Sequence, residues 1–345
     1  MSGPAALAET GFAPDLGEKF AAGLRSGLLR DVHSLLVARR GRVVLEYYGA
    51  GPDEAWGRPL GPVQFGPEVL HDLRSVSKSI IGLLYGIALA RGLVPPPEAP
   101  LLAAFPAYAD LATPERTGLR VVHALTMTMG TAWDEWSIPY TDPRNSEIAM
   151  ENAPDRLRFI LGQAVVRPPG QAWTYSGGAV ALLAALIERG SGRRLEDFAR
   201  EALFDPLGLG PVEWAVGRDG VASGASGARM RPRDLLRLGQ MVVAGGVWQG
   251  RQVVPRAWIE ASTERATQTE DGLGYGRLFF LGEAPVRGRP APWSAGFGNG
   301  GQRLWLMPKA ELVVVGFSGA YNQPDSWITP LRIWREIVLA NLLDS

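Results

Sequence analysis

Ser75-Val76-Ser77-Lys78 leads into the apolar run Ile80 to Leu89, and this stretch decides how the chain folds. The run is apolar on nearly every side, which is typical of a buried helix. Gly92 follows it and is a suitable residue for the end of such a helix. We therefore expect Ser75 to begin a central helix of the protein.

A serine and a lysine three residues apart share one face of a helix, so the Lys78 amine is predicted to lie within hydrogen-bond reach of the Ser75 hydroxyl. Burial and the partial positive charge of the helix N-terminus both disfavour the ammonium, so the pKa of Lys78 should fall. A neutral amine could then take the serine proton, as in serine hydrolases that use lysine as base. The alternative is that Ser75 or Ser77 only caps the helix and Lys78 reaches solvent.

The composition limits the classes of partner. The formal net charge of the 345 residues is zero, and 46% of them are hydrophobic. No basic run or cationic amphipathic helix is present, so we expect neither nucleic acid nor a membrane as partner. A small molecule is the partner that fits this surface chemistry.

The chain contains no cysteine, which excludes disulfides and thiol nucleophiles. His33, His71 and His123 are widely separated in the sequence, so we predict structural roles for them and no metal site. The first fifteen residues lack the basic and apolar regions of an export signal, so a cytoplasmic location is expected.

Five β-rich runs lie near the two ends of the chain. They are 34–39, 42–48, 275–281, 302–307 and 311–317. Residues 40–41 between the first two runs predict a hairpin. The runs from both ends are expected to form one mostly antiparallel sheet.

The middle of the chain is mostly helical in pattern. The predicted helices cover 70–92, 121–127, 155–161, 179–189, 195–203 and 232–244, and a last one begins near Thr329 and Pro330. This order predicts an α+β protein with two lobes: residues 1–69 and 247–345 form an α+β lobe, and residues 70–246 form a mainly helical lobe. A pocket is expected in the cleft between them.

Tyr175 lies just before the apolar run 179–187, after the turn signal Pro168-Pro169-Gly170. A phenol at this place could share a proton with Lys78 and pass it to a leaving group. The alternative is an ordinary amphipathic tyrosine at a lobe boundary.

The glycine-rich stretch 295–302 formally matches a dinucleotide-binding pattern, but it leads into a strand rather than a helix, so we reject that interpretation. Glycines let a strand edge approach a substrate closely, and an N–H there could stabilise an oxyanion together with the N–H of Ser75. A plain glycine-rich turn is the alternative.

The order of these three motifs resembles the β-lactamase-related serine hydrolase family, which includes class C β-lactamases, DD-peptidases, family VIII carboxylesterases and 6-aminohexanoate-dimer-type hydrolases. The resemblance covers about residues 30–342, and connecting phrases such as Asp72-Leu-Arg and Pro206-Leu-Gly-Leu add to it. It implies a single unit with the β-lactamase/transpeptidase-like fold and a five-stranded sheet flanked by helices. It also implies that Ser75 is the acylated nucleophile, Lys78 its base and Tyr175 a second proton carrier.

Two positions depart from the family pattern. Gly177 stands where an asparagine often contacts the substrate amide, which leaves Ser176 as the nearby polar group. Asn299 stands where β-lactamases carry a lysine that attracts the antibiotic carboxylate. With Gly300, Gly301 and Gln302, it completes the predicted substrate and oxyanion site. The segment 133–147 is similar to a loop of nylon-oligomer-type hydrolases and supports a branch that does not act on antibiotics.

We therefore expect a cofactor-independent serine hydrolase that acts through an acyl-enzyme on small carboxylic esters. The alternatives are hydrolysis of amides or short peptides, weak β-lactamase activity, or a silent binding scaffold. The sequence does not indicate an oligomeric state.

Overall fold

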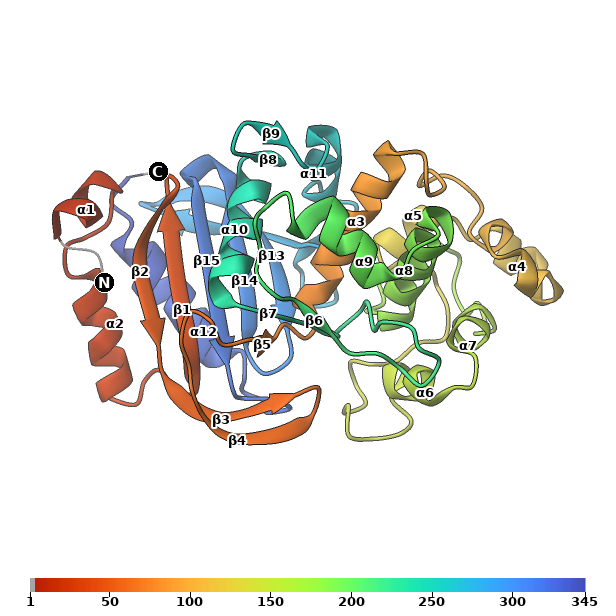
Figure 1. Cartoon of the computed structure of the whole chain (residues 1–345), viewed down its shortest axis with the longest axis horizontal. Coiled ribbons are helices and arrows are strands. Elements are labelled where there is room, and N and C mark those ends of the chain that lie inside the picture. The colour runs from red at the N-terminus through yellow and green to blue at the C-terminus, as the bar shows by residue number, and fades with distance from the viewer. Residues whose placement is uncertain (1–3, 345) are drawn as a thin grey trace.

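The computed structural model of the chain describes residues 4–344 (Figure 1). Within them, eight strands form one antiparallel sheet in the order β10-β11-β12-β13-β14-β15-β1-β2. Their bounds are β1 Val32–Arg39, β2 Arg42–Tyr48, β10 Thr267–Gln268, β11 Gly274–Tyr275, β12 Phe280–Val286, β13 Arg289–Gly298, β14 Gln302–Met307 and β15 Leu312–Ser318.

Strand β1 joins the two ends of the chain. It pairs with β2 on one side and with β15 on the other, where Leu36 lies opposite Val315. All eight residues of β1 are buried because helices cover both faces of the sheet at this point. Its central residues 35–38 are all apolar, while His33, Ser34 and Arg39 are buried polar residues.

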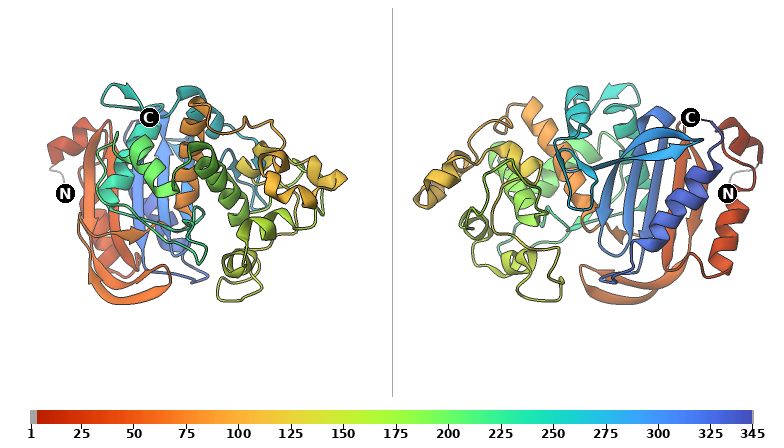
Figure 2. Two further views of the ribbon diagram at one scale, coloured as in Figure 1. Left: turned by 45° about the vertical axis from the view of Figure 1, so that its right-hand side comes forward. Right: turned by 180° about the vertical axis from the view of Figure 1, so that it is seen from behind.

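Helices pack on both faces of the sheet, as the two views of Figure 2 show. Helices α3 and α10 lie on one face, while α2 and the C-terminal helix that starts as α12 lie on the other. The helix bounds are α1 Pro4–Glu9, α2 Leu16–Arg25, α3 Val76–Ala90, α4 Pro114–Thr117, α5 Val121–Leu125, α6 Ser146–Asn152, α7 Arg156–Leu161, α8 Gly177–Ser191, α9 Leu195–Ala199, α10 Pro232–Val243, α11 Arg256–Ser262 and α12 Ile328–Arg332.

The helices α4 to α9 gather beside the sheet and form the other side of the molecule (Figure 1). Helix α3 connects the two parts, because it packs on α8 and also on β13. Helix α10 lies within the segment 70–246 that was predicted as the helical lobe, but it packs on β14 and β15. Among the described residues, no helix has the length and apolar character needed to cross a membrane.

Three small sheets complete the fold. Strands β3 (Ala50–Ala55) and β4 (Arg58–Gln64) form a hairpin, and β8 (Val247–Trp248) pairs with β9 (Arg251–Gln252). The third sheet has the order β5-β7-β6 and holds β5 (His71–Asp72) against β7 (Ala228–Met230), with β6 (Glu213–Trp214) at its edge. This last sheet fixes the segment that leads to Ser75.

The antiparallel sheet with helices on both sides is as predicted, but the number of five strands was wrong. Strand β13 was missed because its two prolines and two glycines are unusual in a strand. The run 275–281 is divided between β11 and β12, since Leu278 has a left-handed backbone (φ 62°) and Gly276 N–H donates to the Phe279 carbonyl over 2.9 Å. A turn therefore interrupts the apolar run.

The central helix begins at Ser75, as the serine-lysine motif predicted, and later than the range drawn from the apolar pattern. The expected range was 70–92, whereas α3 covers Val76–Ala90. Residues His71 and Asp72 pair with β7 instead, and Arg74 has a left-handed backbone with φ 47°. The nucleophile candidate thus stands directly at the junction of a strand and a helix.

Helix α3 contains a position where only glycine fits. A Cβ at Gly86 would lie 2.1 Å from Cδ1 of Trp258, whose indole N–H donates to the Gly82 carbonyl over 2.8 Å. We predict that Gly86→Ala lowers the free energy of unfolding by about 1–3 kcal/mol, although alanine normally favours a helix over glycine. Urea unfolding would measure this loss.

Gly66→Ala is the matched control, because no atom lies within 4 Å of the added Cβ and φ is not positive there. It should change stability little. Equal stability of Gly86→Ala and the wild-type protein would contradict this account of the packing.

Candidate active site

Ser75 stands at the N-terminal end of α3, and its side chain makes no capping hydrogen bond. The hydroxyl of Ser77 accepts from the N–H of Ala228 over 3.2 Å. Neither hydroxyl therefore caps the helix, and that alternative for Ser75 is wrong. The Ser75 hydroxyl is left free to take part in chemistry.

Lys78 points inward and is 2% exposed. Its Nζ donates to Ser75 Oγ over 3.1 Å and to the Ala225 carbonyl over 3.2 Å. The lysine therefore does not reach solvent, which excludes the second alternative. The predicted contact between Ser75 and Lys78 is present.

Tyr175 is the third residue of the group that contains Ser75 and Lys78. It lies before α8 and lines the same cavity as Ser75, and the Lys78 Nζ lies 4.7 Å from the centre of the tyrosine ring. Helices α3 and α8 pack against each other, which brings the two motifs together across about 100 residues of sequence. The structure thus unites the three residues predicted to be catalytic.

Two buried carboxylates stand beside this group, and sequence reasoning missed both. Oε1 of Glu135 lies 3.9 Å from Lys78 Nζ, and Oε2 accepts from the Gly177 N–H over 2.7 Å and from the Trp133 indole over 2.6 Å. Glu147 accepts from the Ser226 hydroxyl over 2.9 Å. Both belong to the segment 133–147, whose resemblance to a hydrolase loop drew attention to the segment but did not single out these two carboxylates.

These carboxylates correct the prediction that the pKa of Lys78 falls. Burial alone lowers this pKa, but Tyr175, which becomes negative when it ionises, and the neighbouring Glu147 and Glu135 together outweigh burial and raise the pKa of Lys78 above its usual value. Burial also raises the pKa of Tyr175, although the Lys78 ammonium opposes this. At neutral pH the resting site therefore holds an ammonium and a phenol.

The glycine-rich strand β13 forms the wall opposite α8. Its pairing with β12 ends at Ala295, so its last residues present an open edge beside α3. A Cβ at Gly298 would lie 2.5 Å from the Leu73 carbonyl, and one at Gly296 would lie 3.2 Å from Val76 Cγ1. Glycine is thus needed for the close approach to the nucleophile, and this approach is made by 296–298.

Most of the predicted binding residues after β13 do not line the cavity next to Ser75. Gly300 and Gly301 have φ of 84° and 94° and form the turn into β14, while the fully buried Gln302 bonds the Ser318 carbonyl over 2.8 Å. Asn299 lines the cavity, but its side-chain amide is paired with Asn322 over 3.0 Å. Of these four residues, only Asn299 borders the space next to Ser75.

The two residues after Tyr175 make contacts within the protein rather than with the cavity. Ser176 Oγ accepts from the Ala179 N–H over 3.1 Å and caps α8. A Cβ at Gly177 would lie 3.0 Å from Glu147 Cδ and 3.2 Å from Glu135 Oε2. The two glutamates therefore fill the space that a side chain at position 177 would need.

A cavity of about 1350 Å³ opens onto the nucleophile. Ser75, Glu135 and Tyr175 line it, together with the aromatic residues Trp136, Trp293 and Phe297. Trp133 and Trp173 are instead mostly buried. The cavity thus combines a reactive polar end with an aromatic wall.

Comparison with known proteins places this geometry in context. The family model described as Beta-lactamase matches residues 29–328. The chain is 26% identical over 328 residues to the 6-aminohexanoate-dimer hydrolase of Paenarthrobacter ureafaciens. This alignment covers 90% of this chain and 77% of the hydrolase.

Solved structures show the same fold. One is the hydrolase EstCE1, which is described as having promiscuous acyltransferase activity. It superposes with a TM-score of 0.71 at 19% identity, and the match covers 97% of this chain and 99% of EstCE1. A family VIII carboxylesterase has a TM-score of 0.66 at 16% identity and covers 92% and 95%. The β-lactamase/transpeptidase-like fold predicted from sequence is confirmed.

The protonation of the site gives a pH prediction. The pKa values of Lys78 and Tyr175 are both raised, so the resting pair must lose a proton before it can accept one from Ser75. We expect kcat/KM for an activated ester to rise with pH above 7. Burial raises the pKa of Glu135 to about 8, so this carboxylate becomes negative within the same pH range. Glu135→Gln removes that charge near Lys78, which lowers the pKa of the lysine and moves the rise to lower pH.

A pH profile of kcat/KM for the wild type and the variant would measure the shift. Glu201→Gln, a surface residue paired with Arg91, is the control and should leave the profile in place. If the rise of kcat/KM in Glu135→Gln occurs at the same pH as in the wild type or at a higher pH, Glu135 does not raise the pKa of Lys78.

Proposed function

This chain belongs to the β-lactamase family, and on that premise we propose that it hydrolyses small carboxylic esters through an acyl-enzyme on Ser75. The family and its hydrolase relatives make it a serine hydrolase. The observation that carries the proposal is the direct contact of Ser75, Lys78 and Tyr175 at the end of an aromatic cavity.

The proposed reaction begins when Ser75 Oγ attacks the substrate carbonyl carbon. The proton of Ser75 passes into the Lys78–Tyr175 pair once that pair has lost its extra proton, and Tyr175 then returns a proton to the leaving group. The developing oxyanion is held by the Ser75 N–H at the start of α3 and by an N–H of the open edge 296–298. Water then repeats the attack on the acyl-enzyme with the proton transfers reversed.

Two features support an ester rather than a β-lactam as substrate. An activated ester leaves without a strong proton donor, whereas a β-lactam presents a carboxylate that needs a cationic partner. The side chain of Asn299 carries no charge and is already paired with Asn322. Loss of a charge-assisted hydrogen bond costs about 1.5–3 kcal/mol, which is a factor of about ten to a hundred and fifty.

An amide substrate is the second candidate, and two observations favour it. The first is the relative from Paenarthrobacter ureafaciens, which is named as a hydrolase of an amide dimer. The second is Arg303, which lines the cavity and forms no ion pair within residues 4–344. Its Nη1 donates to the carbonyls of Gly298 and Gln302, and burial lowers its pKa to about 10. Such a guanidinium could bind a substrate carboxylate, whether of an amino-acid-like substrate or of a β-lactam, so the argument for esters over β-lactams depends on position 299.

The nucleophile assignment is tested by covalent labelling. We expect a serine-reactive fluorophosphonate to add once to the wild-type protein and not at all to Ser75→Ala, because Ser75 lines the cavity beside the Lys78 amine. Intact-protein mass spectrometry would read the result, and Ser79→Ala is the control because its hydroxyl donates to the Leu278 carbonyl. Absence of an adduct on the wild type would favour a silent scaffold.

The substrate class is tested by a comparison of p-nitrophenyl esters, a chromogenic cephalosporin and short amides. We expect kcat/KM for short-chain aryl esters to exceed that for the cephalosporin by at least about a hundredfold. Arg303→Leu should leave neutral esters unaffected and weaken only substrates that carry a carboxylate, through KM. Equal efficiency on esters and cephalosporin would refute ester specificity without affecting the nucleophile.

A further inference from the structure

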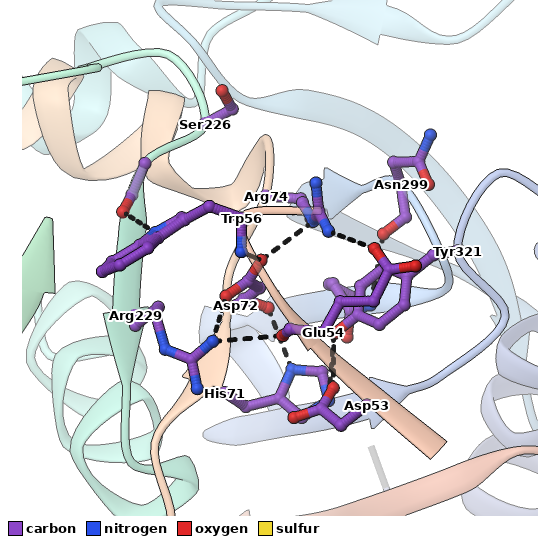
Figure 3. A network of polar contacts seen from close by, with 12 residues as sticks. Asp53, Glu54, Trp56, His71, Asp72, Arg74, Ser226, Arg229, Asn299 and Tyr321 are labelled. Atoms are coloured by element: carbon purple, nitrogen blue, oxygen red, sulfur yellow. Dashed lines mark hydrogen bonds and ion pairs between the residues drawn. The ribbon is translucent and has the colours of Figure 1, made fainter. Parts of the chain in front are cut away.

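A second polar cluster lies beneath the active site, in the core between the sheet and the β3–β4 hairpin (Figure 3). It consists of His33 on β1, Asp53 on β3, His71 on β5 and Tyr321 after β15. The side chains of both histidines and of Asp53 are at most 3% exposed. The two histidines, predicted from sequence to be scattered structural residues, therefore meet in one place.

The atoms of this cluster that can bind a metal converge on a common point. His33 Nδ1 lies 2.9 Å from His71 Nε2, and Asp53 Oδ1 lies 3.9 Å and 3.5 Å from these two nitrogens. The Tyr321 hydroxyl lies 2.9 Å from Asp53 Oδ1 and 3.5 Å from His71 Nε2. Ligand atoms about 2.05 Å from a tetrahedral Zn²⁺ are separated by about 3.3 Å, so these spacings match such a shell closely.

The partners of the surrounding carboxylates also favour a cation at this cluster. Asp72 is paired with Arg229 and Arg74, and Glu54 is paired with Arg74. Asp53 has no guanidinium or ammonium partner among residues 4–344, and its Oδ2 is buried without a hydrogen-bond partner there. A buried carboxylate is normally paired or coordinates a metal. Asp53 therefore keeps one carboxylate oxygen without a partner in the described part of the chain.

The histidines are prepared to act as ligands. His71 Nδ1 lies 3.0 Å from the Asp72 carbonyl and carries the proton, which leaves the lone pair of Nε2 facing the cluster. Phe65 stacks on His33 and Phe317 on His71, which hold the rings in place.

From this geometry we propose that His33 Nδ1, His71 Nε2 and the Asp53 carboxylate bind one divalent transition-metal ion, Zn²⁺ by preference, with the Tyr321 oxygen at the fourth position. Two imidazoles with one carboxylate suit Zn²⁺ rather than Mg²⁺ or Ca²⁺, which prefer oxygen ligands. Binding replaces the hydrogen bond between the histidines, so His33 must carry its proton on Nε2 instead of Nδ1.

The position of this site gives the ion a role in organising the active site. His71 begins the segment that runs through Arg74 to Ser75, and the Arg74 guanidinium lies 4.6 Å above the Tyr321 ring. Asn322, next to Tyr321, holds Asn299 at the cavity. A metal at the cluster would thus tie the strand before the nucleophile to the loop that supports the opposite wall.

The test uses the full chain without an affinity tag. The protein is stripped with dipicolinate in mild urea, refolded and titrated with Co²⁺, which gives strong visible absorption when bound tetrahedrally. We expect saturation at one Co²⁺ per chain and displacement by Zn²⁺. Asp53→Asn keeps the side-chain shape and should abolish the band. His123→Gln, which changes the histidine outside the cluster, should keep the band.

Nuclear magnetic resonance of the imidazole nitrogens gives a second reading that needs no variant, because the chain has three histidines. Zn²⁺ should shift the ring signals of His33 and His71, move the His33 proton to Nε2 and leave His123 unchanged. The melting temperature should rise by about 5 °C when free Zn²⁺ is a hundred times its Kd. Absence of a Co²⁺ band in the wild type, or a full band in Asp53→Asn, would overturn the proposal.

Discussion

The active site depends on one buried charge, the Lys78 ammonium. An ammonium in a protein interior is stable only when hydrogen-bond acceptors and negative charges surround it. Here Ser75, Ala225 and Glu135 come from different parts of the chain to meet this need. The same contacts that stabilise the lysine also fix the serine hydroxyl beside it, so the stability and the reactivity of the site have one origin.

The sheet makes this arrangement possible because it joins the two ends of the chain. Strand β1 pairs with β15, and β13 then lies beside α3 with glycines at the points of closest approach. The helical segment between them returns Tyr175 and Glu135 to the other side of α3. The nucleophile therefore stands at a seam between the sheet and the helices, where backbone and side chains from both can reach it.

Buried polar groups continue from the nucleophile into the core between the sheet and the helices. Asp72, Arg74 and Arg229 form paired charges next to Ser75, and the His71 ring contacts the Asp72 carbonyl (Figure 3). Buried polar networks of this kind are costly unless every member has a partner, and they hold the surrounding backbone in a single arrangement when they are complete. The left-handed backbone of Arg74 is supported by these contacts.

The sequence alone determined the order of the motifs, the buried helix after Ser75 and the antiparallel sheet, because spacing and apolar periodicity are local properties. It also identified Ser75, Lys78 and Tyr175 as partners, through the family resemblance. Tertiary structure alone decided the raised pKa of Lys78, since Glu135 and Glu147 approach it only after folding. It likewise decided the meeting of His33, Asp53 and His71, and the burial of Gln302 away from the cavity. Contacts between segments far apart in the chain leave no periodic signal, so local patterns could not reveal them.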